Sequence, residues 1–139
     1  MKEEEIIQPV SKELLKSELT PDRLLRGTNK SHNDIYVFSA SEAPHLMDEV
    51  GRLREEAFRS AGGGTGKAKD IDEFDLMPNG CKQLIVWNPD NEEIIGGYRY
   101  VFGKEWKFGN DGQPILPTSH MFHFSDKFLK EYAPYTVEL

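Results

Sequence analysis

The chain has 139 residues and a formal net charge of −7, and this length favours one domain with a core of its own. The negative charge argues against binding to nucleic acid, because proteins that bind the phosphate backbone present a basic face. One cysteine allows no disulfide within the chain, and no apolar run is long enough to span a bilayer or to form a signal peptide. We therefore expect a cytoplasmic protein, for which peripheral contact with a membrane is left open.

Residues 1–33 are predicted to form a small helical arm. Ser11 can cap a short helix whose leucines share one stripe. Pro21 then predicts a second helical turn, because proline suits the first position of a helix. This second turn would bury Leu24 and Leu25.

A strand followed by an amphipathic helix is predicted next. Residues 34–39 are rich in β-branched and aromatic side chains, as strands are. Ser41 is expected to cap a helix over residues 43–60, which would begin an α/β layer. The apolar stripe of this helix comprises Leu46, Val50, Leu53, Ala57 and Phe58, and its charged face comprises Asp48, Glu49, Arg52, Glu55 and Glu56.

The glycine-rich loop, residues 61–67, reads Ala-Gly-Gly-Gly-Thr-Gly-Lys and predicts a mobile connection. Its last two residues, Gly66 and Lys67, resemble the end of a phosphate-binding P-loop. However, Ala68 stands where a P-loop has serine or threonine, and this loop follows a helix rather than a strand. We therefore do not expect a nucleotide site here.

Four carboxylates fall within residues 70–75. A solvated run of charge is one interpretation, and a site for a hard metal ion is a second, although the glycine and spacing of an EF-hand are absent. A third is an ion-pair cluster with Arg54 or Arg99 that orients an amine substrate. Asp72 and Asp75 are three residues apart, so one turn could aim both carboxylates the same way.

The next segment predicts a pair of strands over residues 82–88 and 93–102, joined by a polar turn. Both strands are apolar on both faces, so we expect them to be central and covered on both sides. Gly96 and Gly97 interrupt the second strand, which predicts a bulge or a close approach of another chain segment.

The C-terminal part predicts an extended segment, a helix and a strand. Residues 119–124 are expected to be extended, which would point His120 and His123 to opposite faces and argues against a shared metal. Ser125 is expected to cap the helix. Residues 135–139 have the composition of a strand.

Motifs that recur in chain order carry a family resemblance. They are Arg54-x-x-x-Phe58, Asp72-x-x-Asp75, Gly97-x-Arg99, Phe122 with Phe124, and Val137-Glu138-Leu139. This order resembles the acyl-homoserine-lactone synthases and their relatives, the ornithine-lipid and hemolysin-like N-acyltransferases, with the bacterial hemolysin-like branch nearest. The tryptophan that the synthases carry after their Arg–Phe helix is missing, because glycines occupy that region.

The resemblance implies the GNAT fold, an α/β (α+β) architecture with a mixed, mostly antiparallel central sheet flanked by helices. Residues 34–139 would be the N-terminal portion of that domain, preceded by the helical N-terminal arm of residues 1–33. The sheet is expected to be incomplete in its C-terminal half, since the family continues into a pantetheine-binding segment. A chain of this kind could be inactive by itself, and its open sheet edge is expected to support a homodimer.

The activity implied by the resemblance is transfer of an acyl group from the thioester of an acyl carrier protein or coenzyme A to a small amine. It implies no tightly bound cofactor and no metal. Arg54, Phe58, Asp72, Asp75, Arg99 and Phe122 would bind substrate, with Glu138 as general base. An attacking amine must be neutral, so a base must take its proton. Asp70 and Glu73 are expected to face the solvent. The alternative is a non-catalytic binding or membrane-surface module that keeps the fold.

Overall fold

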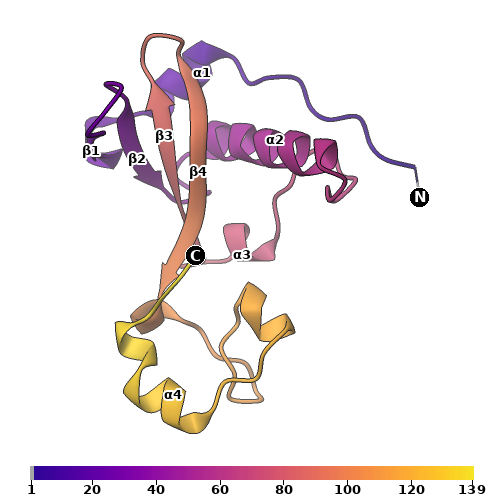
Figure 1. The fold of residues 1–139 in the computed structure, drawn as a ribbon, viewed down its shortest axis with the longest axis vertical. Helices are drawn as coiled ribbons and strands as arrows, with labels where there is room; N and C mark the ends of the chain where they lie inside the picture. The colour runs from indigo at the N-terminus through magenta and orange to yellow at the C-terminus, as the bar shows by residue number, and fades with distance from the viewer. Residues whose placement is uncertain (1) are drawn as a thin grey trace.

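The computed structural model describes residues 2–139 and shows one antiparallel sheet with helices packed against it (Figure 1). The strands lie in chain order, β1 (Leu24–Gly27), β2 (Asp34–Phe38), β3 (Lys82–Asn88), β4 (Glu93–Phe102) and β5 (Val137–Glu138), each antiparallel to its neighbour. The helices are α1 (Lys12–Glu18), α2 (Pro44–Ser60), α3 (Glu73–Leu76) and α4 (Asp126–Glu131). Short 3₁₀ turns cover Pro21–Arg23, Gly103–Glu105, Pro117–His120 and Ala133–Tyr135. The predicted mixed α/β architecture with an antiparallel sheet is confirmed.

The N-terminal arm differs from the prediction in its second half. Ser11 caps α1 as expected, with its hydroxyl accepting a hydrogen bond from the Leu14 amide at 3.3 Å. The predicted second turn begins at Pro21 but is a single 3₁₀ turn that leads into β1, and the predicted burial of Leu24 and Leu25 is wrong, because they are 43% and 60% exposed. Pairing with β2 supplies backbone partners that local helical preference does not reveal. The arm thus contributes an edge strand to the sheet.

Helix α2 lies across one face of the sheet, here called the inner face, and contributes to the larger of the two core clusters. Its cap is Ala43, not the expected Ser41, and Pro44 occupies the first turn. Leu46 and Met47 are buried and pack in one cluster with Phe38, Ala40, Ala43, Leu15, Ile85 and Trp87. The C-terminal half of the helix extends past β4 (Figure 1), and Phe58 there is 55% exposed. The predicted apolar stripe is therefore covered only in its first half.

Glu55 was expected on the solvent-facing side of α2, and this is wrong because its side chain is fully buried. The Thr65 amide and hydroxyl donate to Glu55 Oε2 at 2.9 and 2.6 Å, and the Gly66 amide donates to Oε1 at 2.9 Å. Arg59 Nε donates to Oε1 at 2.9 Å. These hydrogen bonds hold the glycine-rich loop, which was predicted to be a mobile connection, against α2. Glu49, also expected to be exposed, is buried beside Arg52.

The pH dependence of stability tests whether the charge of Glu55 holds the glycine-rich loop. The Thr65 hydroxyl, the Thr65 and Gly66 amides and Arg59 together lower the pKa of Glu55 from 4.5 to about 2, against the effect of burial. A lowered folded-state pKa gives stability that is fully present above pH 4.5 and is lost as the pH falls toward 2. Glu55→Gln should therefore lower the thermal midpoint most at neutral pH. The deficit should shrink between those two pH values in circular dichroism melts.

The matched control is Glu56→Gln, on the exposed side of the same helix turn. Its melting curve should follow that of the unaltered protein across the same pH range. A deficit of Glu55→Gln that stays constant from neutral to acid pH would show that the charge of Glu55 does not hold the loop.

The predicted hairpin of β3 and β4 is confirmed, but the prediction that both faces of these strands are covered is wrong. Gln83, Ile85 and Trp87 are buried on the inner face of the sheet, the face against α2. The opposite face, here called the outer face, holds side chains that are half-buried or exposed and that belong to neither core cluster. Cross-strand partners place Ile35, Val37, Leu84, Val86, Tyr98, Tyr100, Phe102 and Val137 on it. The strands are covered on one side only.

Gly97 and Gly96 form a matched pair for testing the hairpin. A Cβ on Gly97 would press against the Leu84 carbonyl oxygen, whereas one on Gly96 would meet nothing within 4 Å. We expect Gly97→Ala to cost about 1–3 kcal/mol, as overpacking does, and Gly96→Ala to leave stability almost unchanged. Urea unfolding measures both, and equal effects of the two substitutions would contradict the close approach at Gly97.

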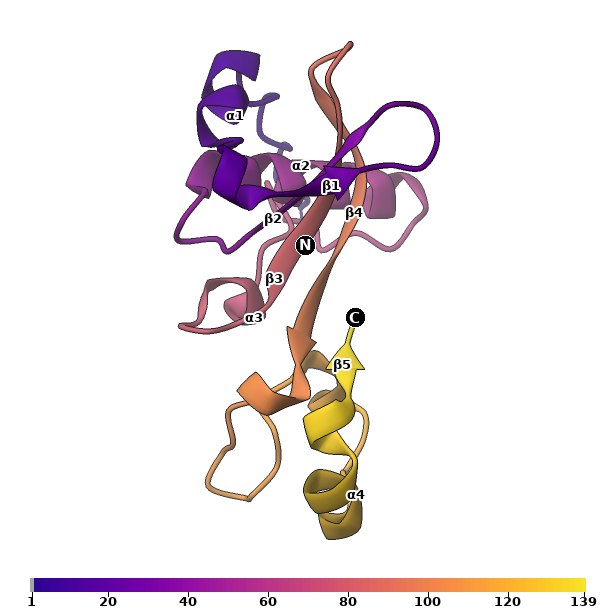
Figure 2. The same cartoon turned by 90° about the vertical axis from the view of Figure 1, so that its left-hand side faces the viewer.

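The C-terminal lobe, residues 103–136, lies at one end of β4 (Figure 2). The prediction of an extended segment at residues 119–124 is wrong for its first half, because the 3₁₀ turn Pro117–His120 occupies it and the Met121 amide donates to the Thr118 carbonyl. Ser125 caps α4 as predicted. A second core cluster fills the lobe and its junction with α3, with Phe74, Cys81, Val101, Trp106, Leu116 and Ala133 buried. None of the helices within residues 2–139 has the length and apolar character needed to cross a membrane.

Candidate active site

The local structure at residues 72–75 aims two carboxylates toward the sheet. Asp72 is the N-cap of α3, and its side chain accepts hydrogen bonds from the amides of Phe74 and Asp75 at 3.0 and 3.2 Å. In return, the Asp75 carboxylate accepts a hydrogen bond from the Asp72 amide at 3.1 Å. This reciprocal capping box fixes both side chains, so the expectation that one turn orients them together is confirmed.

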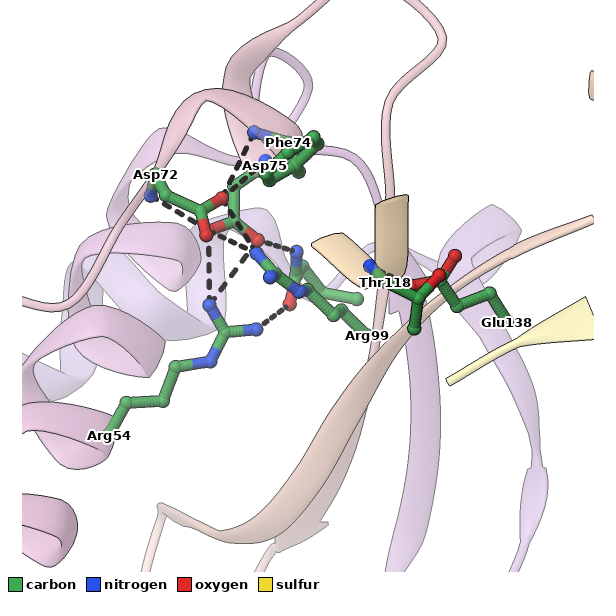
Figure 3. Close-up of polar contacts among 8 residues, drawn as sticks. Arg54, Asp72, Phe74, Asp75, Arg99, Thr118 and Glu138 are labelled. Atoms are coloured by element: carbon green, nitrogen blue, oxygen red, sulfur yellow. Dashed lines mark hydrogen bonds and ion pairs between the residues drawn. The ribbon is translucent and has the colours of Figure 1, made fainter. Parts of the chain in front are cut away.

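Asp75 is the buried centre of what we call the ion network, formed by Arg54, Asp72, Asp75 and Arg99, which Figure 3 labels, together with Gln83. Its side chain is 0% exposed. Arg54 Nη1 donates to both Asp75 oxygens at 3.3 and 3.2 Å, and Gln83 Nε2 donates to Oδ1 at 2.7 Å. Arg54 Nη2 in turn donates to Gln83 Oε1 at 2.6 Å. The buried polar groups are thus joined to one another.

Asp72 and Arg99 form the more accessible end of this network. Arg99 Nη1 lies 2.7 Å from Asp72 Oδ1 and 3.2 Å from Asp75 Oδ2, and the guanidinium sits 5.9 Å from the centre of the Phe74 ring. Asp72 is 40% exposed and Arg99 23%. Burial opposes the charge of Asp72, but the hydrogen bond and charge of Arg99, together with the amides of Asp75 and Phe74, outweigh it and lower the pKa of Asp72 below its ordinary value. The same pair raises the pKa of Arg99, so both remain charged at neutral pH.

The geometry decides among the interpretations of the acidic stretch. Two arginines pair with two aspartates, so the ion network is balanced in charge. The Asp75 side chain is fully buried, which excludes it from a solvated run of charge. Within residues 2–139, no three His, Cys, Asp or Glu side chains are arranged to hold a metal ion. Glu73 faces the solvent as expected. Asp70 is half-buried, contrary to expectation, and burial raises its pKa.

The pairing of β5 with β4 places Glu138 on the inner face of the sheet, the face to which Arg99 also points. Glu138 is the cross-strand partner of Val101, and Arg99 precedes Val101 by two positions, so all three point to the inner face. Glu138 Oε1 accepts the Thr118 amide at 3.3 Å, while Oε2 is buried without a hydrogen-bond partner among residues 2–139. In the view of Figure 3, Arg99 is drawn between the aspartates and Glu138.

Two of the predicted site residues lie away from these polar contacts. Phe58 lines an apolar groove of about 360 Å³ between α2 and β4, into which Arg54 and Gln83 also reach. Phe122 is 63% exposed in the C-terminal lobe and lines a different depression. Cys81 is buried in the second core cluster, and this burial raises the pKa of its thiol, as suits a core residue rather than a nucleophile.

Gln83 is the site residue that the sequence did not reveal. Next to Lys82, Gln83 looks like the polar start of a strand. However, it lies two and four positions before Ile85 and Trp87, so the three side chains share one face of β3, and all three are buried. That alternation is a usable signal, because it predicts a buried amide, and a buried amide needs partners. Here Arg54 and Asp75 satisfy it.

Comparison with known proteins agrees with this geometry. Residues 53–138 match the family described as the acetyltransferase (GNAT) domain. Two curated relatives are each 65% identical over 136 residues, and both carry the name glycine N(alpha)-acyltransferase. One is from Phocaeicola vulgatus and the other from Bacteroides thetaiotaomicron. The match covers 98% of this chain but only 42% and 40% of the relatives, so the chain spans about two-fifths of their length. No solved structure matches. The chain belongs to the acetyltransferase (GNAT) domain family.

Proposed function

We propose that this chain forms the acceptor side of an acyltransferase that moves an acyl group from a thioester to the amino group of glycine. The names of the two relatives support glycine as acceptor. The observation that carries the proposal is the placement of a half-buried glutamate, Glu138, whose buried Oε2 has no partner within residues 2–139, on the sheet face that also presents Arg99. A base and a fixed charge are thereby brought together from distant parts of the chain.

The accessible end of the ion network suits an amino acid. Glycine at neutral pH carries one carboxylate and one ammonium group, so it needs a cation and an anion side by side. Both ion pairs of Arg99 within residues 2–139 use Nη1, which leaves Nε and Nη2 for the carboxylate of an acceptor. Asp72, half-exposed beside it, can hold the ammonium group. Arg54, Asp75 and Gln83 lie deeper and keep this pair in position.

The transfer step follows from these placements. Glycine must lose a proton before it attacks, and Glu138 is the base that accepts it. The neutral amine attacks the thioester carbonyl, the carbon–sulfur bond breaks, and an amide bond forms. The sulfur leaves as a thiolate and takes up the second proton that the nitrogen loses as the amide forms, so it ends as a thiol, and the proton on Glu138 passes to solvent. The products are an N-acylglycine and the free thiol of coenzyme A or of an acyl carrier protein.

The deciding experiment is a transfer assay on the full-length polypeptide. Acyl-coenzyme A and acyl carrier protein thioesters are offered separately, each with glycine or with ethylamine, which lacks the carboxylate. We expect transfer to glycine and little to ethylamine, and the two donor arms identify the natural thioester. Absence of transfer to glycine from either donor would overturn the proposal. Membership in the hemolysin-like branch and contact with a membrane stay predictions.

Arg99 gives a more specific prediction. Arg99→Ala removes the group proposed to hold the acceptor carboxylate, and loss of such a charged pair costs about 2–5 kcal/mol. We therefore expect kcat/KM for glycine to fall at least about 30-fold. Arg26→Ala, an exposed arginine on β1, is the control and should leave the rate unchanged. A normal glycine KM in Arg99→Ala would contradict the assignment.

A further inference from the structure

The 3₁₀ turn Pro117–His120 orients the proposed base from outside the strand that carries it. Pairing with Val101 fixes the backbone of Glu138, but the glutamate side chain can still rotate about its own bonds. Within residues 2–139, the carboxylate has a single hydrogen-bond donor, the Thr118 amide, at 3.3 Å from Oε1. The direction in which the carboxylate points therefore depends on where this turn lies.

The end of the same turn contacts the other half of the candidate site. The His120 ring meets the Phe74 ring edge to face, with 5.7 Å between the ring centres and 73° between the planes. Phe74 is 7% exposed, and the Arg99 guanidinium lies 5.9 Å from the centre of its ring. One short turn thus holds the base through its second residue and touches the support of Arg99 through its fourth.

The C-terminal lobe holds this turn at both ends. Leu116, directly before the turn, is 3% exposed and packs in the second core cluster. The Ser119 hydroxyl donates to the Pro114 carbonyl. After the turn, the Gln113 side chain donates to the Phe124 carbonyl at 3.0 Å and accepts from the Phe124 amide at 2.7 Å. A shift at the last residue of the turn is therefore transmitted to its second residue.

We propose that His120 is a positioning residue for the base. Its contact with Phe74 sets the place of the Thr118 amide. That amide orients the Glu138 carboxylate toward an amine held beside Arg99, and correct placement of reacting groups contributes large factors to rates. His120 acts through the turn and needs no contact with substrate. The role of the base rests on the proposed function, whereas the coupling of His120 to Thr118 can be measured without turnover.

Steady-state kinetics of the full-length polypeptide test the role in transfer. His120→Ala removes the contact with Phe74, and we expect kcat with glycine to fall about tenfold, because an aromatic pair can bias the position of the turn by about this factor. KM for glycine should change little, since the pair of Asp72 and Arg99 is untouched. His120→Phe keeps an aromatic edge at this position and should restore most of kcat.

The matched control is His123→Ala, which should leave kcat unchanged. His123 is exposed three positions later and lies beside Gln113, at 3.5 Å, rather than beside Phe74. A full kcat in His120→Ala would overturn the proposal. A loss of kcat that His120→Phe does not restore would also overturn it, because the imidazole itself would then act in the reaction.

Amide hydrogen exchange of the same polypeptides tests the coupling separately from catalysis. In His120→Ala, the Thr118 amide should exchange about tenfold faster. The Ser119 amide, bonded to the Leu116 carbonyl at 3.1 Å, should keep its rate. Unchanged exchange at Thr118 would overturn the proposal, as would equal acceleration at Ser119, because the turn would then unfold rather than shift. If the unaltered polypeptide transferred nothing to glycine, the proposed function would fail, and the exchange rates would still decide the coupling.

Discussion

Replacement of Asp75 by alanine is expected to lower the free energy of unfolding by about 3–5 kcal/mol. The carboxylate is fully buried and accepts hydrogen bonds from Arg54 and Gln83, with Arg99 at 3.2 Å. Its removal leaves two guanidinium groups, each less than one quarter exposed, without their shared anion. The cost is therefore the penalty of buried, uncompensated charge rather than the loss of one contact. Urea unfolding followed by tryptophan fluorescence measures it.

Glu73→Ala is the control for that measurement. Glu73 lies in the same short helix and faces the solvent, so its loss should change stability by less than about 0.5 kcal/mol. A further comparison is Asp75→Asn, which keeps the size of the side chain but removes the charge. If Asp75→Asn were as mild as Glu73→Ala, the network would be held by its hydrogen-bond geometry and not by its charges, and an equally mild Asp75→Ala would contradict the expected cost.

The largest effect on activity is expected at Glu138. Glu138→Gln keeps the shape of the side chain and its bond from the Thr118 amide, but it removes the base. General-base catalysis contributes about 10²–10⁴ to rates, so kcat of the full-length polypeptide should fall by about that factor. KM for glycine should change little, because Arg99 and Asp72, which we propose hold the acceptor, are untouched.

Two comparisons separate catalysis from folding in that experiment. Glu131→Gln alters an exposed glutamate of α4 and should leave kcat unchanged. The thermal midpoint of Glu138→Gln should stay close to that of the unaltered protein, since the replaced group remains bonded to the same amide. A Glu138→Gln enzyme with full kcat would remove Glu138 from the mechanism and leave the ion network as the only polar feature of the site.

The sequence predicted those elements whose signals are local. Helix α2 and the hairpin of β3 and β4 have strong periodicity and clear turn residues, and both are present with nearly the expected bounds. Strand β1 was missed because it is short and is stabilised by β2, which no local pattern reports. Glu55 was misplaced for a similar reason, because the donors that bury it come from a loop ten residues later.

The candidate site shows the same limit. Residue types alone left three interpretations of residues 70–75, one of which paired the aspartates with Arg54 or Arg99, and the family resemblance favoured that one. Asp75 contacts partners 21 and 8 positions away in the chain, at Arg54 and Gln83. Such pairings depend on the register of strands that the sequence does not specify. The assignment of Phe122 to the site stays a prediction, since its side chain is 63% exposed and its amide bonds the carbonyl of Thr118, the residue whose amide holds Glu138.

The pairing of β5 with β4 constrains how related sequences can vary in length. The Gly103 amide donates to the Thr136 carbonyl at 2.7 Å and closes the base of the C-terminal lobe. Residues inside the lobe can be gained or lost without moving β5, apart from the turn that supplies the Thr118 amide. One residue inserted between Ala133 and Val137 is different, because it would shift the register and turn Glu138 to the outer face. In evolution, insertions should accumulate inside the lobe and be purged from its final four residues.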